Sequence, residues 1–280
     1  MTPSVSVVIP AFQNRGTIGA TIESVLAQSF GNFELIVADH SSDDGTLETA
    51  TSFTSDPRVR VISTPSGGGA VRNWNRVTGE ARGTFVKLLC GDDLLYPDCL
   101  QTQVEALRKQ PTAGMTAVRR DLIDASGKLL LRGRGLGSCD GLVSGREAVR
   151  ATIRAGTNLF GEPACVLMRT ALLRAAGAWR AEQPYLIDQD LYIRILLRSD
   201  LVAVRETLAA FRLSDGQLSF HLVAEQSRQA GALHRRLRRD QPEVISSWDC
   251  LVGSLQARRT SLMRRAAYLV WSRRLTVGAP

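Results

Sequence analysis

Two adjacent acids, Asp92 and Asp93, follow a predicted buried strand over Thr84–Leu89. Neighbouring carboxylates at a strand end repel each other unless a positive charge lies close to them. A hard divalent cation that also binds phosphate oxygens would supply that charge. Alternatively, the pair belongs to the N-terminus of the next helix, ahead of Pro97, where the helix dipole favours acids. The residues themselves leave both interpretations open.

Two further acidic segments lie at a strand end and at a helix start, where side chains commonly bind ligands or act as bases. Asp39 follows a predicted strand over Phe33–Ala38, and acids at that place in nucleotide-binding sheets hydrogen-bond a base or ribose. A simple turn acid is the alternative. Asp188 and Asp190 open a predicted helix that runs to Arg198. A carboxylate at a helix start is commonly a cap, but it also suits a general base that faces a cleft.

The elements between these acids predict how the chain positions them. Strands alternate with helices over the first 90 or so residues, which predicts a parallel sheet with helices on both faces. Ligands of such sheets bind at the carboxyl ends of the strands. The predicted strands are Val5–Ile9, Phe33–Ala38, Arg58–Ile62 (with exposed edge character) and Thr84–Leu89, and the helices are Thr17–Gln28, Asp44–Phe53 and Ala70–Glu80.

After Pro97 the order of elements changes. The predicted helices are Pro97–Lys109, Ser144–Arg154, Thr170–Ala176 and Asp188–Arg198; the strands are Met115–Arg119, Lys128–Arg132, Ala164–Met168, Leu201–Val204 and Leu208–Leu213. From about Gln217 the pattern is helical to the end. Neither common phosphate loop occurs, because GxGxxG is missing after the first strand and GxxxxGK[ST] is missing throughout.

Composition excludes several classes of protein. The 280 residues are 44% hydrophobic and 22% charged, enough for a core and unlike a disordered chain, a collagen or a disulfide scaffold. No apolar run approaches the roughly 18 residues of a membrane span. The first residues form a predicted strand without Lys or Arg before Arg15, so no signal peptide is expected. Five scattered cysteines without a CxxC pair predict reduced thiols.

The net charge of +8 is confined to the C-terminal part. Eleven arginines and three acids follow position 227, so residues 1–227 sum to zero and no nucleic-acid partner is expected. A predicted amphipathic helix over Ser261–Arg274 suits the surface of an anionic membrane, or else packs on the catalytic domain or on a second subunit of a homodimer. Its apolar face has Leu262, Met263, Ala266, Leu269 and Val270, with Arg264, Arg265 and Tyr268 opposite.

Seven segments together resemble the inverting family-two glycosyltransferases with the GT-A fold. Residues 4–12 are similar to the first strand of that family, 24–30 to its first helix end, and 39–46 to its nucleotide acid loop. Residues 73–76 and 81–97 resemble the approach to its DxD metal motif, and 161–163 and 188–194 its acceptor-side and catalytic-base segments. Each motif is weak alone, but their order and spacing over about 4–215 are specific.

The resemblance implies a fold and a domain division. The expected fold class is α/β: a Rossmann-like GT-A fold with a mostly parallel mixed sheet, helices on both faces and a C-terminal helical extension. Residues 1–215 would form the catalytic domain, with a nucleotide-binding half over about 1–98 and an acceptor-binding half over about 99–215. Residues 216–280 would form the basic helical extension.

The resemblance also implies roles for single residues. Asp188 matches the catalytic base, and Glu162 and Asp190 lie on the acceptor side. Asp92, supported by Asp93, would bind the metal cofactor, Mn²⁺ or Mg²⁺. The nucleotide, usually UDP in this family, would contact Pro10, Ala11, Phe12, Asp39, Asn75, Gly91 and Asp92.

Three positions depart from the family pattern. Cys90 replaces the first acid of the DxD motif, and a soft thiol is a poor ligand for Mg²⁺ or Mn²⁺. His40 replaces the second acid of the nucleotide loop, where it either contacts the nucleotide or faces solvent. Ile187 replaces the glutamate before Asp188, so that Asp188 would act alone. His221, after the last strand, either packs, faces solvent or approaches the metal.

The implied function is transfer of a sugar from a nucleotide-diphosphate donor, a UDP-sugar, to a hydroxyl of a glycan or lipid-linked acceptor. Transfer would be a single displacement with inversion, in polysaccharide or cell-wall biosynthesis, in the cytoplasm or at the inner face of the membrane. One alternative, which Cys90 keeps open, is an inactive nucleotide-sugar-binding subunit. The other is a nucleotidyltransferase that makes sugar nucleotides, but residues 10–14 lack the glycine-rich basic loop this would need.

Overall fold

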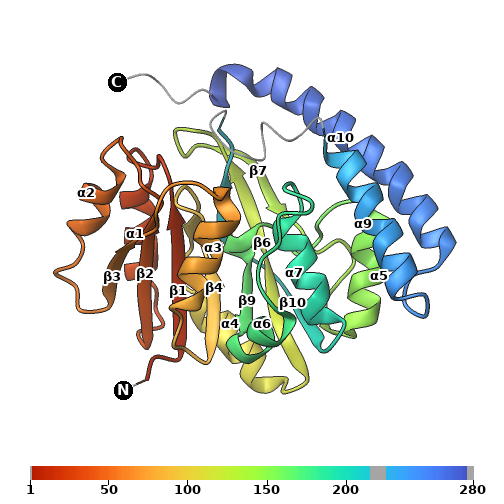
Figure 1. Cartoon of the computed structure of the whole chain (residues 1–280), viewed down its shortest axis with the longest axis horizontal. Coiled ribbons are helices and arrows are strands. Elements are labelled where there is room, and N and C mark those ends of the chain that lie inside the picture. The colour runs from red at the N-terminus through yellow and green to blue at the C-terminus, as the bar shows by residue number, and fades with distance from the viewer. Residues whose placement is uncertain (1, 215–224, 276–280) are drawn as a thin grey trace.

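A single mixed sheet forms the centre of the molecule. The computed structural model describes residues 2–214 and 225–275. Ten strands in this part of the chain form one sheet in the order β3-β2-β1-β4-β9-β6-β10-β5, with β7 paired to β6 and β8 to β10. Helices cover both faces of the sheet (Figure 1). The predicted α/β fold class is therefore confirmed.

The N-terminal part has the predicted alternation of strands and helices. Its elements are β1 (Val5–Ala11), α1 (Ile18–Leu26), β2 (Phe33–Asp39), α2 (Thr46–Thr51), β3 (Val59–Ser63), α3 (Gly69–Gly79) and β4 (Phe85–Leu88). Strand β1 is buried throughout, between parallel β2 and β4, which explains its continuous apolar sequence. Strand β3 lies at the edge of the sheet, as its alternating pattern predicts.

The middle of the chain completes the sheet with mixed directions. Its elements are β5 (Leu94–Leu95), α4 (Cys99–Lys109), β6 (Ala113–Ile123), β7 (Leu129–Arg134), β8 (Gly141–Val143), α5 (Gly145–Ala155), η1 (Pro163–Cys165), β9 (Val166–Arg169), α6 (Thr170–Ala176), α7 (Ile187–Leu196) and β10 (Asp200–Arg212). Strand β9 runs antiparallel to β4 and β6, whereas β10 runs parallel to β6. The sheet is thus parallel at one end and mixed at the other.

Two strand predictions need correction. Residues 201–204 and 208–213 were expected to be separate strands, but β10 runs through both. The exposed Arg205 and Glu206 lie where the register with β6 shifts, so an irregularity within one strand resembles a turn in sequence. Strands β5 and β8, of two and three residues, were not predicted because they are too short to show a period.

Two helices follow the described part of the sheet. They are α9 (Gln226–Asp240) and α10 (Ser247–Leu275), and the chain breaks the predicted continuous helix between them, around Pro242. Helix α10 packs against α5 and α9. Buried His234 lies in α9, and burial lowers its pKa to about 4. No described helix has the length and apolarity that a bilayer crossing requires.

Two predictions lie beyond the described residues. The boundary at residue 215 and His221 both fall in 215–224, so the domain division stays a prediction. All five cysteines are free in the structure, and their reduced state stays a prediction.

A buried lysine links the parallel strand β4 to the start of the antiparallel strand β9. Lys87 of β4 is fully buried, and its Nζ donates hydrogen bonds to the carbonyls of Ala164 (2.6 Å) and Val166 (3.2 Å). Burial lowers the pKa of this ammonium group. The two carbonyls lie at the junction of η1 and β9, so Lys87 fixes the segment that follows Glu162 to the central sheet.

We expect Lys87→Met to lower the free energy of unfolding by about 1–3 kcal/mol, because two buried carbonyls lose their donor. Urea unfolding followed by circular dichroism measures this. Lys109→Met, at an exposed site, is the matched control and should change stability by less than about 0.5 kcal/mol. Equal stability of the two variants would contradict the structural role of Lys87.

Candidate functional site

The carboxyl ends of β1 and β2 form the first side of the site. Pro10 and Ala11 are buried in the ladder beside β2, and Phe12 beyond them is 55% exposed. The Phe12 ring lies 5.9 Å from the His40 ring, centroid to centroid. Just beyond the strands, Gln13 and Ser41 adopt positive φ angles of 53° and 56°. Residues other than glycine rarely have a positive φ unless the surrounding structure imposes it.

Asp39 presents an unused acceptor at this edge. The residue is 1% exposed, and its Oδ2 accepts a hydrogen bond from the Ser42 amide at 3.0 Å. Its Oδ1 is buried and has no hydrogen-bond partner in the described structure. A buried acceptor without a donor is costly. A ligand N–H or hydroxyl group at this place would satisfy it.

His40 is not a solvent-facing loop residue. It is 7% exposed, and its Nε2 lies 3.0 Å from the Gly67 carbonyl, so the ring nitrogen donates. Residues 67–69 are three consecutive glycines with positive φ, a conformation that favours glycine. His40 thus holds the glycine loop before α3 against the end of β2, with Phe12 over its ring.

An asparagine that the sequence analysis assigned no role holds the two strand ends together. The buried Asn73 of α3 donates to the carbonyls of Ala11 (3.2 Å) and Ala38 (2.9 Å). Its Oδ1 accepts from the Thr64 hydroxyl at 2.7 Å. Its pairing with both strands comes from the tertiary fold, and the only signal in the sequence was its place in residues 73–76, which resemble the family.

Asn75, predicted to contact the nucleotide, uses both ends of its amide on another part of the chain. Its Nδ2 donates to the Trp179 carbonyl at 3.1 Å and its Oδ1 accepts from the Trp179 amide at 2.9 Å. Asn75 thus joins α3 to the segment after α6. A role in nucleotide binding stays a prediction.

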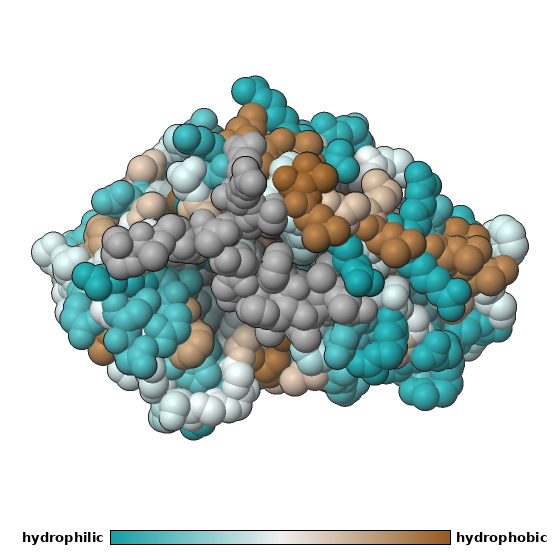
Figure 2. All heavy atoms as spheres, turned by 90° about the horizontal axis from the view of Figure 1, so that it is seen from above, coloured by the Kyte–Doolittle hydropathy of each residue, from teal (hydrophilic) through white to brown (hydrophobic). Residues whose placement is uncertain are grey.

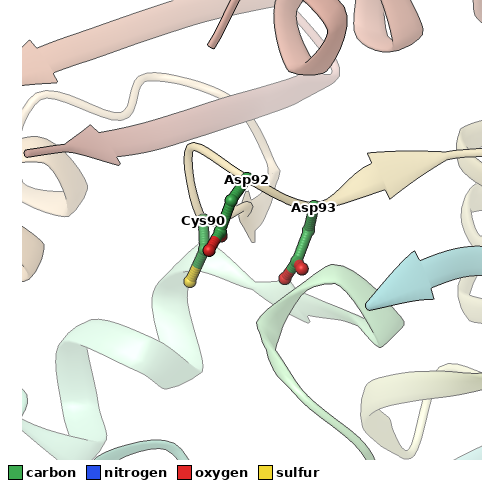
Figure 3. Close-up of side chains that lie close together, drawn as sticks. All are labelled: Cys90, Asp92 and Asp93. Atoms are coloured by element: carbon green, nitrogen blue, oxygen red, sulfur yellow. The ribbon is translucent and has the colours of Figure 1, made fainter. Parts of the chain in front are cut away.

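The acids after β4 form a cluster with Cys90. The nearest ligand atoms of Cys90, Asp92 and Asp93 all lie within 4.8 Å of one another, with Asp92 turned toward the cysteine sulfur (Figure 3). The interpretation of the pair as a helix N-terminus is wrong, because β5 follows it and α4 begins only at Cys99. Gly91 packs closely on Asn14, whose Oδ1 would lie 2.6 Å from a Cβ at that position.

The donor set of this cluster fits a hard cation. Asp93 is fully buried; its Oδ1 accepts from the Arg212 amide at 3.0 Å, and its Oδ2 has no partner in the described structure. Burial and the nearby Asp92 raise its pKa well above the usual range, a penalty that a cation would relieve. Burial, helped by both acids, also raises the pKa of Cys90, which is therefore a neutral thiol and a weak ligand. Asp92 and Asp93 are the residues that fit Mg²⁺ or Mn²⁺.

An arginine at the end of β10 holds this loop in place. The Nε of Arg212 donates to the Asp92 carbonyl at 2.9 Å, and its Nη1 donates to the carbonyls of Ala125 (3.0 Å) and Asp124 (3.3 Å). Sequence analysis missed Arg212. An arginine at a strand end 120 positions from the acids gives no local signal.

Asp188 lies in the first turn of α7, on the other side of the cluster. Leu186 occupies the N-cap, so Asp188 is not the capping residue. Its carboxylate accepts hydrogen bonds from Asn158 Nδ2 (2.9 Å) and from the Gln189 amide (2.7 Å). Burial, with the charge of Glu162 adding to it, outweighs these bonds and raises the pKa of Asp188 to about 7. Such a carboxylate is suited to exchange a proton near neutral pH.

Glu162 lies close enough to Asp188 for its charge to help raise the pKa of that carboxyl group. Arg120 Nη2 donates to its Oε1 at 2.8 Å and orients the carboxylate. The charges of Asp188 and Glu162, with Asp92 and Asp93, contribute to the raised pKa of Cys90. Asp92, Asp93, Asp188 and Glu162, whose charges all act on Cys90, therefore form one electrostatic group. It contains the predicted metal ligands, the predicted base and one predicted acceptor-side residue.

Asp190 is not part of this group. It is buried, and it pairs with Arg194, whose Nε lies 3.0 Å from Oδ2, and with Arg236 of α9. These pairs join α7 to α9. Its predicted position on the acceptor side stays a prediction.

Comparison with known proteins agrees with this arrangement. The model of the family described as "Glycosyl transferase family 2" matches residues 6–176. The Mycobacterium tuberculosis protein MT1568 is 32% identical over 219 residues, which is 75% of this chain and 67% of that protein. The UDP-Glc:alpha-D-GlcNAc-diphosphoundecaprenol beta-1,3-glucosyltransferase WfgD of Escherichia coli is 33% identical over 105 residues, 38% of this chain and 41% of WfgD.

A solved structure has a similar fold. TarS 1–349 of S. aureus, also crystallised with UDP and with UDP-GlcNAc, superposes with a TM-score of 0.65 at 17% identity, over 84% of this chain and 65% of TarS 1–349. The carboxyl-end site, the GT-A-type sheet and the family match lead to one conclusion: this chain belongs to glycosyl transferase family 2 and is a glycosyltransferase.

Proposed function

We propose that this glycosyltransferase moves a sugar from a UDP-sugar to a hydroxyl of a glycan or lipid-linked acceptor, with inversion at the anomeric carbon. One observation carries the proposal: Asp188, with a pKa of about 7, stands in one electrostatic group with the Asp92–Asp93 pair. We thus place a base for the acceptor next to a site for the diphosphate. A single displacement needs both and needs no covalent nucleophile.

The nucleotide is proposed to lie along the ends of β1 and β2. The free Oδ1 of Asp39 suits the N–H edge of uracil, and the exposed ring of Phe12 offers a surface for stacking. Pro10, Ala11 and Gly91 would line this path with backbone. UDP is chosen because TarS, which shares the fold, was crystallised with UDP and UDP-GlcNAc, and because the name of WfgD specifies UDP-Glc as its donor.

The diphosphate leaving group develops negative charge as the glycosidic bond breaks. Asp92 and Asp93 would hold Mn²⁺ or Mg²⁺, which when bound supplies Lewis-acid stabilisation of that charge. Asp188 takes the proton of the acceptor hydroxyl while its oxygen attacks C1 from the face opposite the nucleotide. Glu162, oriented by Arg120, accepts a hydrogen bond from the acceptor and aligns it.

The name of one relative supports the proposed acceptor class. The name of WfgD specifies a sugar linked to diphosphoundecaprenol, which is a lipid carrier. The proposed role is therefore in the biosynthesis of a polysaccharide or cell-wall glycan. An inactive nucleotide-sugar-binding subunit is the second candidate, favoured by the neutral thiol of Cys90 at a metal position. UDP binding without turnover of any donor would support it.

The first prediction for the site concerns Asp188. The kcat/KM of the wild type should rise with pH and level off above a midpoint near 7, since the base works only when ionised. Asp188→Asn should lower kcat by about 10²–10⁴ and leave the Kd of UDP nearly unchanged. A collapse of UDP affinity in this variant would make Asp188 a binding or structural residue.

Asn158→Ala provides an internal check on that pH profile. Removing a donor to the carboxylate raises the pKa of Asp188 further, so the midpoint should move to higher pH. Asp140→Asn, at an exposed position outside the site, is the control and should leave the midpoint in place.

The second prediction concerns Asp39. Asp39→Ala should raise the Kd of UDP, without any sugar, about tenfold or more, since one hydrogen bond to a charged acceptor is lost. Isothermal titration measures this, with Asp43→Ala in the same loop as the control. Unchanged UDP affinity would remove Asp39 from the nucleotide site.

The third prediction concerns the metal. Asp92→Asn should abolish transfer and weaken Mn²⁺ binding in the presence of UDP, because a carboxylate ligand becomes a neutral amide. Electron paramagnetic resonance of free Mn²⁺ measures binding apart from activity. Cys90→Asp should instead tighten Mn²⁺ binding, since a hard ligand replaces a neutral thiol. Full activity of Asp92→Asn would overturn the metal assignment.

A further inference from the structure

Helix α10 presents an uncovered apolar stripe along its length. Trp248, Leu255, Leu262 and Leu269 recur every seven residues and are 57–78% exposed. Leu251, Met263 and Val270 widen the stripe and are 53–79% exposed. Figure 2 shows the apolar atoms running along this side of the molecule between polar ones. The stripe begins well before the predicted amphipathic segment over 261–274.

The opposite face of α10 already holds the helix in place. Gly253 packs so closely on α5 that a Cβ there would lie 2.2 Å from the Ile153 carbonyl, and Ala257 and Ser261 are buried. Arg264 donates to Thr157 Oγ1 at 2.9 Å and to the Tyr185 hydroxyl. Arg264 therefore faces the domain, on the side of the helix away from the apolar stripe. The exposed stripe is not needed to attach α10 to the domain.

The outer face is also basic. Arg258, Arg259 and Arg265 are exposed, and none of them forms an ion pair with a described residue. Residues 247–275 contain six arginines and a single acid, Asp249, which is buried and pairs with Arg154. Arg258 and Arg265 lie along one edge of the stripe, and Arg259, four residues after Leu255, lies within it. Apolar side chains with arginines among and beside them match a surface with acyl chains beneath anionic headgroups. A second copy of this chain would bring the same positive charge against it.

One end of α10 lies toward the side of the molecule where β1 and β2 end. The helix descends from the upper middle of Figure 1 along its right-hand side, whereas β1 and β2 stand at the left with their carboxyl ends upward. Its inward residue Tyr268 has a pKa raised to about 12 by burial, with Tyr185 and Glu162 contributing. Arg264 of α10 also contacts the hydroxyl of Tyr185, three residues before Asp188, so the second half of α10 lies near the start of α7.

We infer that α10 binds the enzyme to a membrane that contains anionic phospholipids, with the stripe inserted at the interface and Arg258, Arg259 and Arg265 on the headgroups. The helix lies on the bilayer rather than across it. A lipid-linked acceptor would then reach Glu162 from the membrane side. That consequence rests on the proposed function, whereas membrane binding itself does not.

The test is co-sedimentation of the full chain with vesicles, without donor or acceptor. The protein should bind vesicles of phosphatidylcholine mixed with phosphatidylglycerol and bind pure phosphatidylcholine at least about tenfold more weakly. Binding should fall when salt is raised from about 0.1 M to about 1 M, since the Debye length shrinks from about 10 Å to about 3 Å.

Two triple variants separate the apolar and the charged contributions. Leu255→Ser with Leu262→Ser and Leu269→Ser should reduce the partition coefficient about tenfold or more, because buried apolar area drives insertion. Arg258→Gln with Arg259→Gln and Arg265→Gln should remove most of the preference for anionic vesicles. All six positions are exposed, so the fold should be retained, which circular dichroism checks.

Matched variants elsewhere on the surface serve as controls. Leu129→Ser with Leu131→Ser and Leu142→Ser changes three leucines that are 39–48% exposed and lie in β7 and β8. Arg108→Gln with Lys109→Gln and Arg146→Gln removes three positive charges from α4 and α5. Neither control should change vesicle binding by more than about twofold.

Three outcomes would overturn the inference. One is a wild-type chain that does not bind anionic vesicles, and another is equal binding by the leucine variant. The third is a dimer in sedimentation velocity that becomes a monomer in the leucine variant, without vesicle binding, since a second copy would then cover the stripe. Failure of sugar transfer with vesicle binding intact would instead count against the proposed function alone.

Discussion

The burial of several carboxylates close together is the constraint on which the site depends. Asp93 is fully buried, and Asp92, Glu162 and Asp188 contribute to the same field around Cys90. Negative charges in a low dielectric repel strongly unless donors and cations surround them. Much of the middle of the chain supplies those partners.

The partners come from elements far from the acids in sequence. Arg212 reaches the Asp92 carbonyl from the end of β10, and Arg120 of β6 pairs with Glu162. Lys87 fixes the junction after Glu162 to β4. The contacts of Arg212 and Lys87 join residues before Pro97 to strands and turns after it, so the geometry of the site depends on the whole mixed sheet. The order of strands, with β9 between β4 and β6, is what makes this possible.

Two departures from the family pattern, Ile187 and Cys90, change the charge of the site. Ile187 is buried at the start of α7, so no carboxylate precedes Asp188, and the raised pKa of Asp188 arises mainly from burial, with Glu162 adding to it. Cys90 keeps its thiol neutral among the acids. One negative charge fewer in the cluster reduces the repulsion that the fold must offset. The same change leaves fewer hard ligands for a cation.

The sequence by itself determined the parallel half of the sheet and the positions of Asp39, Asp92 and Asp93 at its strand ends. Those features follow from local hydrophobic period and from where an apolar run stops. It also indicated a helix near the C-terminus, although only over part of the length of α10.

Only the tertiary structure decided which groups meet. In the structure Asp188 bonds Asn158, and Asp190 lies outside the site. His40 bonds the Gly67 carbonyl, and Arg212 bonds the Asp92 carbonyl, 120 positions earlier in the chain. The tertiary structure also decided which face of α10 is covered by α5 and which is left open. A local pattern reports how often apolar residues recur, but not which residues 30 to 120 positions away will supply a donor, a charge or a packing surface.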